Sequence, residues 1–222
     1  MEFLHDDNPV AAFLNRLMDL ILVNLLFVAC SIPLVTIGAS FTAVYDVCMK
    51  LALREEVSAV SAFFHSFIRN LKRATGLFAL TVAVGAFLAV DFWCALRWDV
   101  AFKFASQVVI LSVSYFYIAV VSHAFPALAW FGEPVFRTIR RSFVLAMRNG
   151  VYTVFVMVMD LLPILMFFLT PTAFWRFLFL WLTVGFAFLA YLNSLHLVRL
   201  FDPQRVRDME ENRRQERNRK GK

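Results

Sequence analysis

Long apolar runs alternate with short polar connections along this chain. Residues 20–45, 74–90, 104–132 and 177–198 contain no Asp, Glu, Lys or Arg, and residues 150–169 contain only Asp160. A helix of roughly 20 apolar residues crosses a bilayer core of about 30 Å. Lipid offers backbone groups no hydrogen-bond partner, and polar positions do not alternate within these runs. The pattern therefore predicts membrane-spanning helices rather than a barrel.

The first apolar run is too long for one helix. Pro33 and Gly38 lie within it, and we expect a break there because proline removes a hydrogen-bond donor and glycine tolerates unusual backbone angles. The prediction is an all-α polytopic membrane helix bundle, residues 1–201, with about six transmembrane helices. They cover residues 10–32, 35–53, 74–96, 104–126, 150–169 and 177–199. An alternative lays residues 41–53 along the membrane, which leaves five spans and an external N-terminus.

Two connections between the spans are amphipathic, with apolar residues at helical spacing on one side and basic residues on the other. We call these predicted interfacial helices elbows, and they cover residues 57–72 and 134–148. We expect their basic side chains to face anionic lipid headgroups. These lipid-interface residues are Arg69, Lys72, Arg73, Arg137, Arg140, Arg141 and Arg148. Ser66-Phe67 and Ser142-Phe143 align the elbows at an offset of 76 residues, through either a duplication or a chance match.

Lysines and arginines are distributed unevenly among the connections. Under the six-helix prediction, the inner connections and the tail hold eighteen of them, and the outer connections hold Arg97, Lys103 and Arg176. Cytoplasmic loops carry such an excess, so we expect both termini in the cytoplasm. The tail, residues 202–222, is nearly all charged or polar and is predicted to be a disordered cytoplasmic segment. It has no aromatic residue to stack on bases, so we expect no nucleic-acid partner.

Composition narrows the possible functions further. Hydrophobic residues make up 61% of the chain and charged residues 17%, which is more apolar than an ordinary soluble domain. The three cysteines are odd in number and irregularly spaced, which argues against a disulfide framework or a zinc site. The seven glycines do not cluster into a phosphate-binding loop, and the histidines have no recognisable nucleophile partner. The sequence therefore predicts no enzyme, no metal site and no cofactor.

Asp160 is the most unusual residue of the spans, because a charged side chain at the bilayer centre costs at least about 2.5 to 3.5 kcal/mol on insertion scales. It would either belong to a proton, cation or substrate site, or hydrogen-bond a neighbour such as Asn24 or Asn193 to fix helix packing. Asp46 and Lys50 are four residues apart and can pair on one helix face. The candidate intramembrane polar site therefore comprises Asp160, Asn24, Asp46, Lys50 and Asn193.

Several short motifs lie near the start of the chain. They are Asn8-Pro9, Asn15-Arg16, Asp19, Asn24, Ser31-Ile32-Pro33, residues 36–40 including Gly38, residues 42–43, Lys50-Leu51, Arg54-Glu55-Glu56, Phe63-Phe64, Phe67 and Asn70. Together these residues resemble the opening of the YesL-like family of bacterial integral membrane proteins. The chain departs from the family pattern at Val57-Ser58, where a glycine and an aromatic residue would be expected.

The resemblance implies a bacterial plasma-membrane protein of unknown function that is associated with carbohydrate uptake. The leading hypothesis is a non-enzymatic accessory protein that contacts a sugar permease or a sensor subunit through its helices. One alternative is a small transporter or channel with an interior path lined by Asp160, Asn24 and Asp46. Another is a membrane or signal sensor that acts through the elbows. The lipid bilayer is a partner in every case, and a homo-oligomer is left open.

Overall fold

The computed structural model describes residues 9–55, 57–97, 100–169, 172, 175, 178–208 and 211. Within these residues the chain is helical and contains no strand, which confirms the predicted all-α class. The elements are α1 (Pro9–Cys30), η1 (Leu34–Thr36), α2 (Ile37–Ala52), α3 (Ala59–Ala95), α4 (Val100–Phe131), α5 (Val135–Arg148), α6 (Gly150–Leu169), α8 (Leu178–Leu180), the π-helix η2 (Trp181–Gly185) and α9 (Phe186–Phe201). Residues 203–208 of the predicted disordered tail are helical, and Asn8, Arg176 and most of that tail lie outside the described residues.

Helix α2 lies at the centre of the fold. Twelve of its 16 residues are buried, and it packs against α1, α3, α4 and α9. Small side chains such as those of Ala39 and Ala43, both fully buried, let the neighbouring helices approach closely. Helix α2 therefore positions polar side chains that point toward several different helices.

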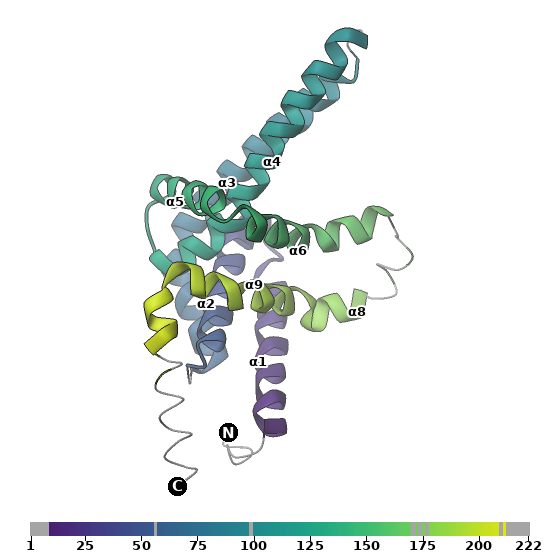
Figure 1. The fold of residues 1–222 in the computed structure, drawn as a ribbon. Helices are drawn as coiled ribbons and strands as arrows, with labels where there is room; N and C mark the ends of the chain where they lie inside the picture. The colour runs from purple at the N-terminus through teal and green to yellow at the C-terminus, as the bar shows by residue number, and fades with distance from the viewer. Residues whose placement is uncertain are drawn as a thin grey trace.

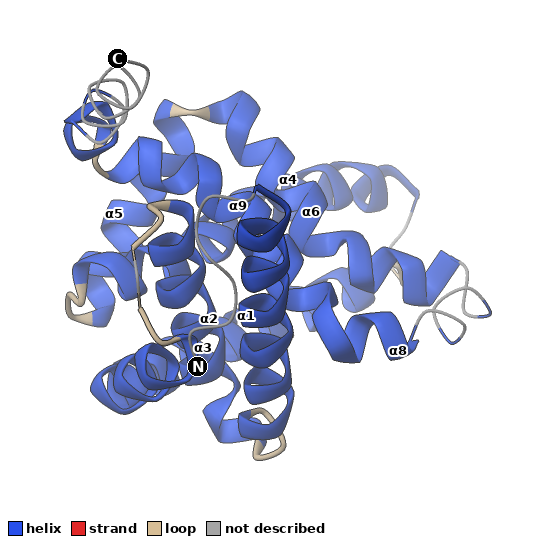
Figure 2. Ribbon diagram, turned by 90° about the horizontal axis from the view of Figure 1, so that it is seen from below, coloured by secondary structure: helices blue, strands red, loops and turns tan. Residues whose placement is uncertain are grey.

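Two pairs of helices leave this centre in different directions. The outer halves of α3 and α4 run together as a hairpin, whereas α6 and the segment from α8 to α9 extend side by side (Figure 1). The view from below shows α6 and α8 both projecting away from the core (Figure 2). Large apolar side chains, including those of Phe87, Trp93 and Phe179, are exposed on these segments. Such surfaces suit contact with lipid hydrocarbon rather than water.

Several helices are long and apolar enough to cross a membrane. Five segments among the described residues meet this condition, and a sixth span results if α5 and α6, which meet at 114°, are counted as one broken span. The chain is therefore a polytopic membrane helix bundle, as the sequence predicts.

The chain turns between α1 and α2 near Pro33, at the position where the sequence predicts a break. Thr36 Oγ1 lies 2.7 Å from the backbone oxygens of both Cys30 and Pro33, so its one hydrogen can be donated to either of them. The last carbonyl groups of a helix have no partner within it, so the Thr36 hydroxyl compensates for the end of α1.

The two predicted elbows differ in the structure. The first continues directly into the following span, so that elbow and span form the 37-residue helix α3. Arg73 and Ala74 at the junction are both good helix formers, and no helix breaker separates the two parts. The second elbow is the separate helix α5, which ends at Asn149, where the backbone leaves the helical region with φ −129° and ψ 55°. An amphipathic pattern alone does not distinguish these two outcomes.

Candidate functional site

Asp160 meets two polar side chains from other helices in the interior of the bundle. Asn193 of α9 donates from Nδ2 to Asp160 Oδ1 at 3.0 Å, and the Tyr45 hydroxyl of α2 donates to the same oxygen at 3.3 Å. Asn193 is fully buried. The Tyr152 hydroxyl donates to the backbone oxygen of Asn193 at 2.9 Å and fixes that residue further. The Asp160 carboxylate therefore ties α2, α6 and α9 together.

A cavity of about 480 Å³ lies beside this carboxylate, between α2, α3, α4, α6 and α9. Most of its lining is aliphatic or aromatic, and its polar groups come from Tyr45, Thr81, Tyr117, Ser122 and Asp160. The Tyr117 hydroxyl is already engaged, because it donates to the backbone oxygen of Thr81 at 2.6 Å. Apolar walls with a few convergent polar groups are typical of sites for small amphipathic ligands. The cavity can thus hold an apolar group with its polar or cationic end at Asp160.

Asn24 lies elsewhere, at the contact between α1 and η2. Its Nδ2 donates to the backbone oxygens of Trp181 and Leu182 at 3.1 and 2.7 Å, and its Oδ1 accepts from the backbone N–H of Ala187 at 2.9 Å. A π-helical segment interrupts the regular α-helical hydrogen bonds. The fully buried Asn24 side chain supplies partners at that interruption, so it serves helix packing rather than the Asp160 cluster.

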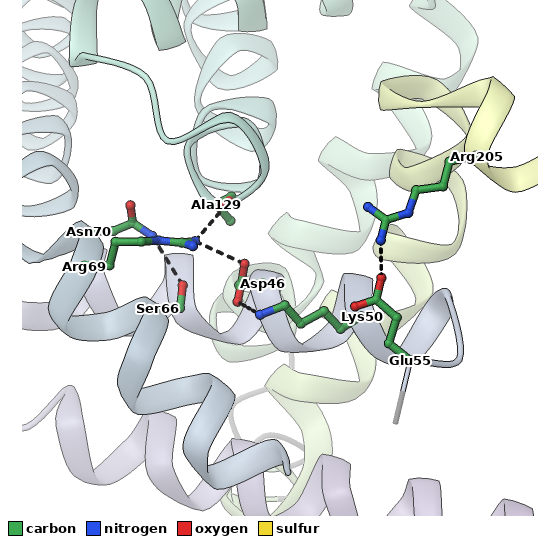
Figure 3. A network of polar contacts seen from close by, with 8 residues as sticks. All are labelled: Asp46, Lys50, Glu55, Ser66, Arg69, Asn70, Ala129 and Arg205. Carbon is green, nitrogen blue, oxygen red and sulfur yellow. Dashed lines mark hydrogen bonds and ion pairs between the residues drawn. The ribbon is translucent and has the colours of Figure 1, made fainter. Parts of the chain in front are cut away.

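Asp46 forms a third polar cluster, toward α3 and the end of α4 (Figure 3). The Lys50 Nζ lies 2.6 Å from Asp46 Oδ2, and an Arg69 guanidinium nitrogen lies 3.4 Å from Asp46 Oδ1. The same nitrogen donates to the backbone oxygen of Ala129 at 3.5 Å. Asp46 and Lys50 do not line the cavity beside Asp160. The five candidate residues therefore occupy three separate places, and the structure brings together only Asp160 with Asn193 and Asp46 with Lys50.

Three of the predicted lipid-interface residues make contacts within the protein. Besides Arg69, Arg73 donates to the backbone oxygen of Gly132, just after the end of α4. Arg141 lies 2.8 Å from Glu133 Oε1 and above the ring of Phe131. Cations near the carboxyl end of a helix interact favourably with its dipole, so Arg69 and Arg73 stabilise the end of α4. The other four are exposed: Lys72, Arg137, Arg140 and Arg148.

Residues of the motifs near the start of the chain have mainly packing roles. Gly38 faces α3 so closely that a Cβ atom there would lie 2.5 Å from the backbone oxygen of Ala74. Asn70 is fully buried, and its Nδ2 donates to Ser66 Oγ at 3.3 Å. On α1, Arg16 and Asp19 are half-buried and Asn15 is exposed.

The sequence did not single out Tyr45, Ser122 or Tyr152, which surround Asp160 or its partner. Their hydroxyl groups stand within apolar runs, which could have marked them as candidates. A hydroxyl in a membrane helix often bonds the backbone of its own helix, however, so its presence does not indicate a site. The imidazole of His123 behaves in the same way, because its Nδ1 lies 2.9 Å from the backbone oxygen of Ala119, four residues earlier in α4. No three metal-ligating side chains come together within the part of the chain that the structure describes.

Comparison with known proteins gives one match. The model of a family described as "Protein of unknown function, DUF624" matches residues 20–92, from the middle of α1 to the end of α3. Asp46, Lys50 and Arg69 lie inside the matched region, whereas Asp160 and Asn193 lie outside it. Neither the curated proteins nor the solved structures gave a match. The chain is thus a multi-pass membrane protein, and the family description leaves its function open.

Proposed function

We propose that this chain is a non-enzymatic accessory protein of a carbohydrate uptake system in the bacterial plasma membrane. It would act through helix contacts with a sugar permease or a sensor subunit. The resemblance of its first part to the YesL-like family supports this association. The match of residues 20–92 to a family of unknown function is compatible with it.

The observation that carries the proposal is the use of interior polar groups as links between helices. Asn24 holds η2, Asp46 holds Lys50 and Arg69, and Asp160 holds its partners on α2 and α9. Polar groups that bond neighbouring segments in this way stabilise the packing of the helix bundle. The cavity beside Asp160 is lined mainly by apolar side chains, which suits a sugar-conducting path poorly.

An even number of membrane crossings also fits the arrangement of the helix ends. Arg16 near the start of α1 and Arg199 near the end of α9 line the same cavity, so these two helix ends lie on the same side of the bundle. The excess of basic residues in the connections on that side supports a cytoplasmic location. The accessory protein would therefore meet its partners within the membrane and at its cytoplasmic face.

Crosslinking in the native host followed by purification in mild detergent tests the accessory role. We expect a sugar permease or its sensor subunit to be recovered with the tagged chain, and not with an unrelated multi-pass protein expressed at the same level. Recovery of neither subunit above that control, in cells grown on several sugars, would contradict the proposal.

A small transporter is the second candidate, because the cavity beside Asp160 places a carboxylate in a chamber with mainly apolar walls, between helices of a membrane bundle. Flux into liposomes separates the two functions. A transporter requires solute flux that Asp160→Asn abolishes and that Asp91→Asn, which changes a carboxylate outside the cavity lining, leaves intact. Absence of flux for every sugar and ion tested would rule out transport and leave the accessory role.

A further inference from the structure

The carboxylate of Asp160 is bound by neutral groups within the part of the chain that the structure describes. The Asn193 amide and the Tyr45 hydroxyl donate to its Oδ1 at 3.0 and 3.3 Å, and the Ser122 hydroxyl interacts with the same carboxyl group. The ion pairs among the described residues all involve other carboxylates. A carboxylate in the interior without a cation beside it is costly, so the binding of a cation there would be favourable.

The helices around the cavity beside Asp160 do not supply that cation. Lys and Arg are absent from the stretches of α3, α4, α6 and α9 that reach it, which are residues 74–96, 104–131, 150–169 and 186–198. The one basic residue of α2, Lys50, pairs with a different carboxylate, and Arg199 of α9 lines a different cavity. The histidines of α4 and α9, His123 and His196, are not among the described lining residues. These helices therefore offer the carboxylate no cation of their own.

Aromatic rings form much of the wall next to this carboxylate. The ring centroids of Phe41 and Tyr45 lie 6.4 Å apart, and those of Phe41 and Phe125 lie 6.0 Å apart. Because the Tyr45 hydroxyl also bonds the carboxylate, this row of three rings begins at the charged group. Three more aromatic side chains line the cavity: Phe78, Tyr117 and Phe186. A cation is attracted to the faces of aromatic rings as well as to a carboxylate, and the cavity offers both.

We propose that the cavity of about 480 Å³ beside Asp160 binds a small organic ammonium ion, with its nitrogen at the carboxylate and its apolar body along the row of rings. The volume lies within the range that is usual for small-molecule sites. Ca²⁺ or Mg²⁺ would need about six or more oxygen ligands, and the mainly apolar walls offer few oxygens. A zwitterionic phospholipid fits poorly, because its phosphate would lie close to the same carboxylate. Binding of the ammonium ion requires no transport and does not depend on the proposed role in carbohydrate uptake.

Binding to the full-length chain in neutral detergent tests the proposal. The probes are three amines of increasing size, which are 3-methylbutylamine, 2-phenylethylamine and 4-phenylbutylamine, at pH 7, where they are protonated. The alcohols with the same carbon skeletons are the neutral controls, and 4-phenylbutanoate is the anionic control. Thermal unfolding and native mass spectrometry report the affinity and the number of molecules bound per chain.

We expect one molecule of an amine to bind per chain, at least about tenfold more tightly than the matching alcohol, because the alcohol carries no charge. The anionic control should not bind. If no amine bound saturably, or if each amine and its alcohol bound equally well, the proposal would be overturned.

Two aspartates give a matched comparison of variants. Asp160→Asn removes the charge from the cavity but keeps an oxygen that can accept from Asn193 and Tyr45. The control, Asp91→Asn, removes a carboxylate of α3 that does not line the cavity. The affinity of Asp160→Asn for the amine should fall about tenfold or more, and that of Asp91→Asn should change less than about twofold. Equal affinities of the two variants would contradict the assignment of Asp160.

A photoreactive ligand locates the site in the wild-type chain, so this test does not depend on the folding of a variant. The probe is 2-phenylethylamine with a diazirine group on its ring, and mass spectrometry identifies the modified peptides. We expect modification within residues 118–126 of α4 or 186–190 of α9, which contribute to the lining, and an excess of 4-phenylbutylamine should suppress it. Modification confined to other segments, or unaffected by the excess, would show that the amine does not occupy this cavity.

Discussion

Helices α2 and α3 approach each other closely at Gly38, and an added methyl group there should separate them. A Cβ atom at this position would lie 2.5 Å from the Ala74 backbone oxygen and 2.7 Å from the Phe78 Cβ. Neither neighbour is the end of a flexible side chain, so relief requires movement of a helix. Overpacking of this kind costs about 1 to 3 kcal/mol.

Part of this cost is offset by the conformational preference of alanine. In a helix interior, alanine is favoured over glycine by roughly 0.5 to 1 kcal/mol, and Gly38, as the second residue of α2, should gain no more than that. We therefore expect Gly38→Ala to lower the free energy of unfolding by about 1 to 2 kcal/mol. Gly76→Ala on α3 is the matched control, since a Cβ atom there meets only Val135 Cγ2, at an ordinary 3.9 Å. That variant should gain roughly 0.5 to 1 kcal/mol.

Reversible unfolding in mixed micelles of mild and denaturing detergent, followed by circular dichroism, measures both variants. The two changes are chemically identical and both lie in helices, so their difference isolates the contact between α2 and α3. If Gly38→Ala proved as stable as Gly76→Ala, the close approach of these two helices would be wrong.

Three further predictions concern polar and cysteine side chains. Asn24→Leu removes the bonds to η2 and α9 and should lower the free energy of unfolding by about 2 kcal/mol or more; unchanged hydrogen exchange at residues 181–187 would contradict this role. Asp46→Asn should lower the free energy of unfolding by about 1 kcal/mol, because the pair of Asp46 with Lys50 is partly exposed. Lys50→Gln should then destabilise the Asp46→Asn variant less than it destabilises the wild type. If the effects of the two changes simply added, the two side chains would not be coupled. Cys94 is exposed near the end of α3, so an impermeant maleimide should label it in intact cells when the other cysteines are serine; labelling only after permeabilisation would reverse the proposed orientation.

The membrane-spanning helices were predictable because lipid imposes the same requirement on every crossing segment. An apolar run of sufficient length must be helical, whatever its neighbours are. The break near Pro33 was predictable for an equally local reason, because proline lacks the N–H that a continuing helix needs. Such features depend on residues close together in the sequence.

The direction in which each polar side chain points was not predictable in the same way. A helix that is apolar on all sides gives little indication of its rotation about its own axis. Asn24 was a candidate partner of Asp160, yet it faces η2. Arg69 was expected at lipid headgroups, yet it meets Asp46. A basic side chain on an amphipathic helix satisfies either environment, and only the packing of distant segments decides between them.

A cavity where α1 begins and where α2 and α9 end shows the same limit more strongly, because three arginines line it. Arg16, Arg54 and Arg199 belong to segments far apart in the sequence, and each alone looks like a residue at the end of a span. Their convergence follows from the positions of α1, α2 and α9 relative to one another. No local pattern contains that information.

The bonds of Asn24 to η2 also affect how the chain is made. Asn24 precedes its partner Trp181 by 157 residues, and ribosomes add about 5 to 20 residues per second. At that rate its amide waits roughly 8 to 30 s in the membrane before the segment that satisfies it has been synthesised. The first helix thus stays incompletely bonded until the last one is inserted. A chain that stops before the final helix would retain a buried, unpaired amide that quality-control proteases in the membrane could recognise.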